Sequence, residues 1–191
     1  ELNSSGYALS DAAGISFDGD VYILGGFGAN DTINNKILRV VPTNDNVRLE
    51  ELPARFPDEQ VKSVVVRIGD RFYAGLGRTG VGLSGILYSK ELWSSADMTS
   101  WSSEADCPTE ADGVVAGAAC GNKLYVLDTN LDLYVFDPAT DDWTKQRTSI
   151  RSSLQSNNLT SIFMFAYNGY LYMGQTNGNK RFVRYDPAWD N

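Results

Sequence analysis

A motif that recurs four times, at intervals of about fifty residues, is the feature that most constrains the fold of this chain. Each copy is a short glycine-containing turn followed by a run of strand-forming residues with a tyrosine near its centre. The four tyrosines are Tyr22, Tyr73, Tyr125 and Tyr172, spaced by 51, 52 and 47 residues. Such regular spacing indicates one structural unit repeated four times along the chain.

Each unit shows the pattern of four antiparallel strands. A mostly apolar run precedes every glycine turn, so the first two strands form a hairpin. These first runs are Ala12–Phe17, Val61–Ile68, Val114–Ala119 and Ile162–Tyr167. Third runs follow at Lys36–Val41, Leu131–Phe136 and Lys180–Tyr185, and fourth runs at Val47–Leu52, Trp101–Glu104 and Trp143–Arg147. Pro138 and Pro187 end two of the third strands, because proline cannot donate to a strand ladder.

Four short strands joined by tight turns are typical of a propeller blade, which buries its faces only by packing against neighbouring blades. The sequence therefore predicts an all-β protein, a β-propeller of four blades of four antiparallel strands in one domain, residues 1–191. The approximate blade boundaries are 1–53, 54–105, 106–148 and 149–191. Small residues in 113–119 suit crowding at the axis, and Phe163 and Phe165 suit the wedges between blades.

The units resemble the kelch family, whose repeat runs from a hydrophobic strand to a Gly-Gly doublet, a Tyr-Asp-Pro strand and a tryptophan. Only the first unit has the full doublet, Gly25-Gly26; the equivalent pairs are Leu76-Gly77, Asp128-Thr129 and Gln175-Thr176. In the second unit, residues 95–101 resemble the Asp-box turn of propeller glycosidases. There we expect Ser95 and Asp97 to bond to the local backbone and to have a structural role.

The phase of the repeat leads to an expectation about the ends of the chain. The equivalent of Trp143 in the last unit would be residue 192, one beyond Asn191, while Glu1–Asn3 matches the outer-strand tail at Glu51–Pro53. Either the two ends close a four-bladed ring, or the chain is part of a larger propeller. We favour the second, because residues 1–5 make a poor outer strand.

Composition narrows the chemistry. The chain has no histidine, which excludes Ser-His-Asp and Cys-His nucleophile systems and most zinc and copper sites. Among kelch-like families, the copper radical oxidases need histidine ligands, so that activity is excluded for this segment. We expect no cofactor and no metal. Cys107 and Cys120 flank the third inner strand, and about 20 Å of extended chain between them predicts two free thiols.

Charge and hydropathy exclude two classes of partner. The chain has 24 acidic and 16 basic residues, a net charge of −8, whereas nucleic-acid binding depends on lysine and arginine neutralising phosphates. Anionic membrane surfaces are disfavoured for the same reason. No apolar run is long enough to span a bilayer, so we expect neither nucleic-acid binding nor membrane insertion.

Propellers generally bind ligands at one end of the axis, in the loops that enter the first strand and leave the second strand of each blade. Arg78 is the strongest candidate, because an arginine fork suits a carboxylate or a sugar acid. We expect Arg151 and Arg55, in loops that enter inner strands, to converge with it. The other candidate ligand-binding residues are Phe27, Asp128, Asn130, Gln175 and Asn177. The alternative is that these are solvated loop residues.

Residues 128–132 alternate oxygen-bearing side chains as at the start of a calcium loop. Leu133 occupies the place of the expected glycine, however, and Ala139 that of the bidentate glutamate. We therefore prefer a tight turn between strands to a calcium site.

No catalytic set maps onto the chain, and its repeats are degenerate. We therefore expect a non-enzymatic protein-interaction or scaffold module of kelch type, part of a larger cell-surface or secreted bacterial protein, with an unidentified protein or glycan partner. The expected location is extracellular or in the cell envelope. The alternative is a carbohydrate-binding or glycan-processing propeller that resembles the sialic-acid mutarotases, in which carboxylates and arginines would serve.

Overall fold

The computed structural model describes residues 9–44, 46–83, 85–154, 162–175 and 181–189. These residues form four antiparallel sheets, which we call blades 1 to 4, and a separate hairpin. Blade 1 consists of β1 (Ala13–Phe17), β2 (Asp20–Leu24), β3 (Lys36–Pro42) and β4 (Val47–Arg55). Blade 2 consists of β5 (Val64–Ile68), β6 (Arg71–Gly75), β9 (Leu92–Ser95) and β10 (Ser102–Ser103).

Blade 3 consists of β11 (Val114–Cys120), β12 (Lys123–Asp128), β13 (Leu133–Asp137) and β14 (Asp142–Gln146). Blade 4 consists of β15 (Ile162–Tyr167), β16 (Tyr170–Gln175) and β17 (Phe182–Tyr185). The separate hairpin consists of β7 (Arg78–Gly82) and β8 (Gly85–Tyr88). Short helical segments are η1 (Ala29–Asp31), α1 (Ile150–Leu154) and η3 (Pro187–Trp189), and none of the described helices has the length and apolarity that crossing a bilayer requires.

Turn chemistry explains why the first two strands of each blade pair in register. Phe17 pairs with Asp20, and Tyr167 pairs with Tyr170, so two-residue turns join the strands. The turn residues Asp18-Gly19 and Asn168-Gly169 all have positive φ angles. Two-residue hairpin turns require such angles to match the strand twist, and Asp, Asn and Gly adopt them most readily.

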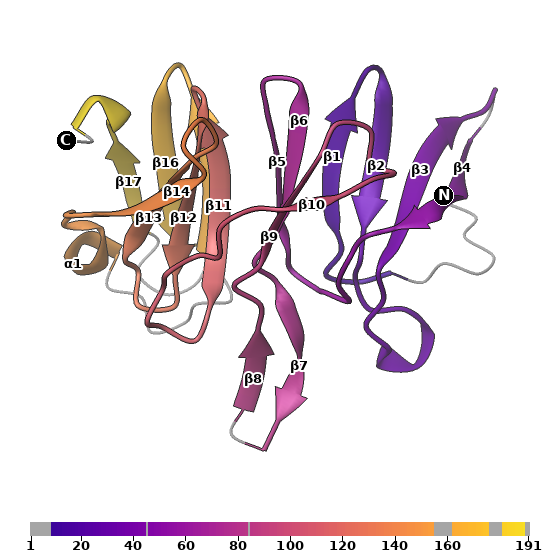
Figure 1. The fold of residues 1–191 in the computed structure, drawn as a ribbon, viewed down its shortest axis with the longest axis horizontal. Coiled ribbons are helices and arrows are strands. Elements are labelled where there is room, and N and C mark those ends of the chain that lie inside the picture. The colour runs from indigo at the N-terminus through magenta and orange to yellow at the C-terminus, as the bar shows by residue number, and fades with distance from the viewer. Residues whose placement is uncertain (1–8, 45, 84, 155–161, 176–180, 190–191) are drawn as a thin grey trace.

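The four blades stand in a row, with blades 1 and 4 at its opposite ends (Figure 1). The inner strands β1, β5, β11 and β15 contact one another in that order. This arrangement confirms the predicted all-β propeller fold of antiparallel sheets. It differs from the prediction in two places: within the described residues blade 4 has three strands, and the hairpin β7–β8 separates the second and third strands of blade 2.

Three apolar clusters lie between successive blades. We call the face that each blade turns toward the next one along the chain its forward face, and the opposite side its backward face. The forward face of blade 1 meets blade 2 where the Phe17 and Phe72 rings lie edge to face, 4.7 Å apart. Blade 2 meets blade 3 through Tyr73 and Phe136, whose ring centroids are 5.9 Å apart.

The forward face of blade 3 completes the series. Tyr125 and Leu133 lie there, against Leu171 and Met173 on the backward face of blade 4. All four side chains are at most 2% exposed. Blades 2 and 3 thus bury both of their faces against neighbouring blades, as blades in a propeller do.

The Asp-box turn of blade 2 also forms as the sequence predicts. The Ser95 hydroxyl accepts a hydrogen bond from the Met98 N–H at 2.8 Å. The Asp97 carboxylate accepts bonds from the Thr99 and Ser100 N–H groups at 2.8 and 3.1 Å. A hydrogen bond from the Thr99 side chain has the largest effect on the pKa of Asp97. Together with the two backbone bonds it lowers this pKa to about 2. The expected structural role of Ser95 and Asp97 is confirmed.

Candidate functional site

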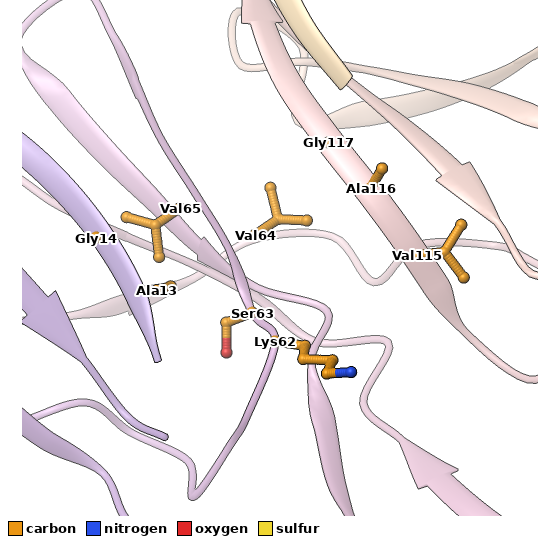
Figure 2. A pocket seen from close by; sticks show the side chains of 9 residues that line it. All are labelled: Ala13, Gly14, Lys62, Ser63, Val64, Val65, Val115, Ala116 and Gly117. Carbon is orange, nitrogen blue, oxygen red and sulfur yellow. The ribbon is translucent and has the colours of Figure 1, made fainter. Parts of the chain in front are cut away.

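The inner strands of the first three blades line an open cavity of about 210 Å³ where β1, β5 and β11 begin (Figure 2). Small side chains line most of it, so backbone atoms of the inner strands reach its surface. This volume lies below the roughly 300–1,000 Å³ of pockets for drug-sized ligands, so it suits a smaller molecule. The lining residues are Ala13, Gly14, Lys62, Ser63, Val64, Val65, Val115, Ala116 and Gly117.

Lys62 contributes the cation of this cavity. Its backbone N–H donates to the Asp11 carbonyl at 2.8 Å, and its ammonium lies 3.6 Å from the Asp11 carboxylate. Both side chains are about 40% exposed, so water screens the ion pair and it holds the ammonium only weakly. Lys62 can therefore turn toward an anion in the cavity at little cost.

A buried glutamine next to the cavity joins the loops of blades 1 and 2. The Gln60 carbonyl accepts a hydrogen bond from Gly26 N–H, and its side-chain oxygen accepts one from Gly77 N–H, at 2.9 and 2.8 Å. A Cβ on Gly25 would lie 2.3 Å from the Gln60 carbonyl oxygen. The Gly25-Gly26 doublet thus makes room for the next blade's backbone, and its role here is packing.

Two of the predicted binding residues take part in a repeated pairing of loops. Phe27 forms an antiparallel bridge with Ser10 in blade 1, and Arg78 forms one with Val61 in blade 2. The Arg78 backbone bonds are 2.8 and 2.9 Å long. The Arg78 Nε atom is buried and, in the part of the chain that the structure describes, has no hydrogen-bond partner. Arg78 thus keeps bonding capacity at the cavity end of the propeller.

Asp128 stabilises a tight turn between strands, which is the interpretation that the sequence favoured over a calcium site. Its carboxylate accepts bonds from the N–H groups of Asn130 and Asp132 at 2.8 and 2.9 Å, and from the Thr109 hydroxyl at 2.8 Å. Asp128 is 1% exposed, so these three donors satisfy a carboxylate that water does not reach. Asn130 is exposed at the surface of this turn. No cluster of three or more potential metal-ligating side chains occurs among the described residues.

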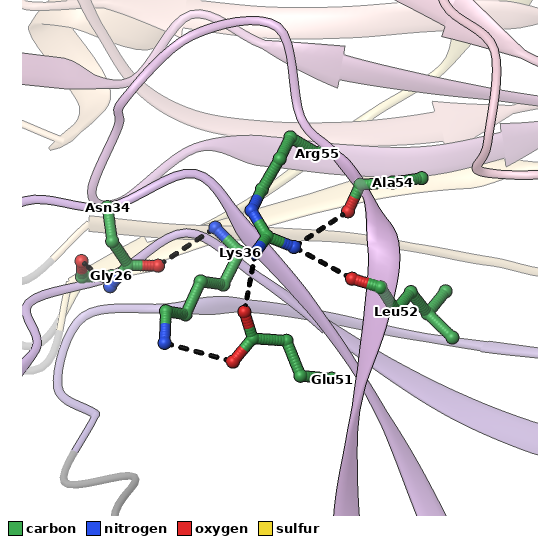
Figure 3. A network of polar contacts seen from close by, with 7 residues as sticks. All are labelled: Gly26, Asn34, Lys36, Glu51, Leu52, Ala54 and Arg55. Carbon is green, nitrogen blue, oxygen red and sulfur yellow. Dashed lines mark hydrogen bonds and ion pairs between the residues drawn. The ribbon is translucent and has the colours of Figure 1, made fainter.

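Arg55 lies elsewhere than predicted. It is the last residue of β4, in register with Lys36, and not part of a loop that enters an inner strand. Its guanidinium donates to Glu51 at 2.6 Å and to the Leu52 and Ala54 carbonyls at 2.7 and 3.2 Å (Figure 3). Glu51 also bonds the Lys36 ammonium at 2.9 Å. These bonds extend the outer strand past the predicted end and keep the Arg55 charge within blade 1.

The remaining predicted residues lie near blade 4. Arg151 is exposed on α1, a single helical turn that the sequence analysis took for a loop. Gln175 ends β16 and is 7% exposed. Asn177 lies outside the described residues. The structure therefore brings Phe27 and Arg78 to the same end of the propeller as the cavity, while their binding role stays a prediction.

Comparison with known proteins agrees with this geometry. No family model matches the chain. A Kelch domain-containing protein of Vibrio cholerae serotype O1 is 36% identical over an alignment of 90 residues, and the match covers 41% of this chain and 24% of that protein. The structure of YjhT matches with a TM-score of 0.67 and 16% identity, covering 87% of this chain and 58% of that chain. The chain has the fold of a kelch-type β-propeller.

The chain thus spans about a quarter of the length of the curated relative (24%) and less than two thirds of YjhT (58%). The likeness to YjhT, at 16% identity, shows the fold alone.

One element departs from the regular kelch-type blade and was missed by the sequence analysis. The β7–β8 hairpin projects beyond the blades, from the end of the propeller opposite the β1–β2 turn (Figure 1). The glycines in 77–85 resemble a loop and hid its strands. The length of the segment between the second and third strands of the blade is the sequence signal for the hairpin. It is 16 residues between β6 and β9 in blade 2, but 4 residues between β12 and β13 in blade 3.

The base of the hairpin is fixed and its outer part is not. Ser89 N–H donates to the Gly77 carbonyl at 2.8 Å, and Tyr88 packs so closely that a Cβ on Gly113 would lie 2.2 Å from its ring. Toward the tip, Val81 is 75% exposed and Leu87 is 50% exposed. Nothing lies within 4 Å of the Cβ position of Gly85.

The two cysteines have no place in this site. Both cysteines are buried, and no disulfide bond joins them. Burial raises the pKa of Cys107 to about 12, so its thiolate, the reactive form, is negligible at neutral pH.

Proposed function

We propose that this kelch-type propeller is a non-enzymatic protein-interaction module and that the β7–β8 hairpin is its contact element. The observation that carries this is the exposure of four large aliphatic side chains on the hairpin. They are Val81, Leu83, Ile86 and Leu87, at 75%, 110%, 43% and 50% exposure. An exposed group of apolar side chains on a projecting element is typical of an interaction site.

The hairpin has both features that a contact element needs. Its base is anchored to blades 2 and 3, so its position is set before binding and little entropy is lost on association. A two-stranded hairpin by itself is marginally stable in water, and its edges leave backbone groups that a partner strand pairs with. Val81 pairs with Ile86, so these two side chains lie on one face, and Leu87 lies on the other. We infer a partner with an apolar groove that receives the hairpin.

The test is a comparison of captured partners. The intact chain and two double variants, Leu83→Asp/Ile86→Asp on the hairpin and Phe165→Asp/Trp189→Asp on blade 4 and η3, are used as bait for proteins of the source cells. Both variants replace exposed apolar residues by the same charges. Each retained protein is then purified and its Kd for all three baits is measured by calorimetry. The proposal expects a partner whose Kd rises at least about 30-fold for the hairpin variant only. A partner that binds all three baits equally would contradict it.

A second candidate function has its own observation. The cavity of about 210 Å³, with Lys62 on its wall and the unpartnered Arg78 Nε at the same end of the propeller, favours a small sugar acid as ligand. Thermal-shift titrations with acidic and neutral monosaccharides test it. An increase in Tm with the acids alone, lost in Lys62→Ala or Arg78→Ala, supports carbohydrate binding. Silence across the series would exclude it.

A further inference from the structure

The apolar face of the β7–β8 hairpin turns toward blade 3. Tyr88, the last residue of β8, packs so closely on blade 3 that a Cβ on Gly113 would lie 2.2 Å from the Tyr88 ring. Side chains two residues apart on a strand point to the same face, so Ile86 shares this face with Tyr88. Val81 lies there too, because it pairs with Ile86. The face that carries Val81 and Ile86 is therefore on the side of the hairpin nearest to the loop before β11.

That loop, residues 104–113, is held against the base of the hairpin. The Cys107 N–H donates to the Lys90 carbonyl at 2.9 Å. The Lys90 ammonium donates to the Thr109 carbonyl at 2.5 Å. Both bonds join the loop to a residue that follows Tyr88 by two positions, so the loop has a set position relative to β8.

The loop next to the apolar face is acidic. It contains four acidic residues and no basic one. Three of these residues, Asp106, Glu110 and Asp112, are exposed, and Glu91 directly after Lys90 is exposed as well. In the part of the chain that the structure describes, none of these four carboxylates forms an ion pair. The Lys90 ammonium offsets one of the four charges, so this side of the hairpin base keeps a net negative charge.

The other side of the hairpin base is acidic too. Arg78, the first residue of β7, is bridged to the loop before β5 and is half-buried. That loop carries Asp58 and the exposed Glu59, which together exceed the single charge of Arg78. The Lys62 ammonium of the same loop is already paired with the Asp11 carboxylate. The apolar hairpin therefore rises from a base of negative charge on both sides.

We infer that the partner of the hairpin is a basic protein, whose apolar groove has lysine or arginine side chains along its rim. This inference rests on the proposed role of the hairpin as the contact element. The apolar side chains define the contact, and the carboxylates at its base define the charge of the surface that meets it. Charge complementarity around an apolar contact speeds association and suppresses partners of the same charge. The same charge disfavours an anionic membrane as the occupant.

Two synthetic amphipathic helical peptides serve as probes for the test. They share one pattern of leucines, and their polar positions are all lysine in one peptide and all glutamate in the other. The Kd of each peptide for the full chain is measured by fluorescence anisotropy. At low salt we expect the lysine peptide to bind at least about 10-fold more tightly than the glutamate peptide. This preference should fall at ~1 M salt, where exposed charges are screened.

A pair of matched variants locates the charge that matters. Glu110→Gln/Asp112→Asn removes two carboxylates beside the hairpin and should raise the Kd of the lysine peptide about 3- to 10-fold, as expected for two exposed charge pairs. Asp18→Asn/Asp70→Asn removes two exposed carboxylates from the β1–β2 and β5–β6 turns, at the opposite end of the propeller (Figure 1). This control should leave the Kd unchanged. Equal effects of the two variants would overturn the inference, because the attraction would then be a general property of an acidic chain.

A third variant, Leu83→Ser/Ile86→Ser, separates this inference from the proposed function, because it removes apolar side chains without changing the charge. Near-ultraviolet circular dichroism shows that each variant is folded. If both peptides bind equally and both are weakened by this variant, the hairpin is a contact element but its partner is not basic. If this variant changes neither Kd, the lysine peptide does not bind through the hairpin and both proposals fail.

Two further outcomes would also overturn the basic partner. One is that the lysine peptide does not bind at all; the capture experiment described above would then still decide the role of the hairpin. The other is hairpin-dependent binding to phosphatidylcholine vesicles in preference to the lysine peptide, which would make a membrane the occupant.

Discussion

Blades 3 and 4 have the same strand pairing but different residues on their forward faces. The second-strand tyrosines Tyr125 and Tyr172 are equivalent, and by the same register Leu133 corresponds to Phe182 and Ala118 to Phe165. In blade 3 these positions are buried against blade 4, with Leu133 at 0% exposure. In blade 4, within the described residues, they form an exposed aromatic surface.

The difference shows what limits the size of the side chains on each face. Where β11 packs against both neighbours, space is short: a Cβ on Gly117 would lie 2.7 Å from Val64 of blade 2. Small residues there let three inner strands approach the axis. On the forward face of blade 4 the rings fill their own sheet, and a Cβ on Gly174 would lie 2.4 Å from the Phe163 ring. The same strand pattern thus yields a close-packed interior in blade 3 and, within the described residues, an exposed aromatic surface in blade 4.

The largest effect should come from truncating equivalent positions of the two faces. Leu133→Ala removes buried methyl groups and should lower the free energy of unfolding by about 2–5 kcal/mol. Phe182→Ala, at a position with 58% exposure, should cost less, about 0.5–1.5 kcal/mol from its lost contact with the Tyr172 ring. Urea titration of both variants checks this. Equal losses would show that the forward face of blade 4 is packed like that of blade 3, and the comparison would fail.

A second prediction separates the fixed base of the hairpin from its free tip. Gly113→Ala places a methyl group where the Tyr88 ring lies and should cost about 1–3 kcal/mol by overpacking. If Tyr88 is the obstacle, Gly113→Ala should cost little more in a Tyr88→Ala background. A double-mutant cycle measured by urea unfolding gives this coupling. Additive losses would indicate that Gly113 has another role.

The outer strands give a third contrast, because β10 of blade 2 has two residues and β14 of blade 3 has five. The Asp97 turn that precedes β10 should therefore matter. Asp97→Asn keeps an acceptor oxygen but loses the charge, so at neutral pH it should lower the free energy of unfolding by less than the ~1 kcal/mol that full loss of a helix cap costs. The pKa of Asp97, lowered from 3.8 to about 2, fixes the pH dependence. Because the pKa is lower in the folded state, the ionised carboxylate stabilises the fold at pH values above the unfolded-state pKa. This stabilisation is lost as the pH falls from about 4 through about 2.

The measurement is the difference in unfolding free energy between the wild type and Asp97→Asn at pH 7 and at pH 2.5. The difference should shrink at the lower pH. Asp18→Asn removes the same charge from the exposed β1–β2 turn and serves as the control. A difference that stays constant over this range would show that the carboxylate charge contributes nothing.

The repeat tyrosines and turn glycines predicted the fold well, because two-residue turns and strand alternation are local properties. The Asp97 turn was readable for the same reason. The sequence did not predict which face of a blade is covered, because aromatic residues such as Phe163 and Phe165 are compatible with both a wedge between blades and an exposed face. Arg55 was misplaced because the strand end depends on its side-chain bonds to Glu51 and the backbone of 52–54.

The candidate site was less predictable than the fold. Phe27 and Arg78 each follow the second strand of their blade, as strand order predicts, but Arg78 begins strand β7 and does not lie in a loop. The cavity was not foreseen, because it depends on how closely three inner strands converge and on which of them carry small residues. No sequence motif marks Lys62 as a residue of the cavity wall. Its backbone N–H bonds to the carbonyl of Asp11, which lies in the loop before β1 of blade 1, and this contact depends on how the two blades pack.

The smallest predicted effect is the most informative about function. Leu83→Ser at the hairpin tip should change the free energy of unfolding by about 0.5 kcal/mol or less, because a side chain with 110% exposure loses no packing. Folding alone would therefore allow a polar residue at position 83, and the proposed partner binding would explain why a leucine occurs there. Thermal unfolding of Leu83→Ser and Leu92→Ser, a buried leucine in β9, provides the measurement and its positive control. A large loss for Leu83→Ser would show that the tip is buried in solution, and the hairpin would then be part of the fold and not a contact element.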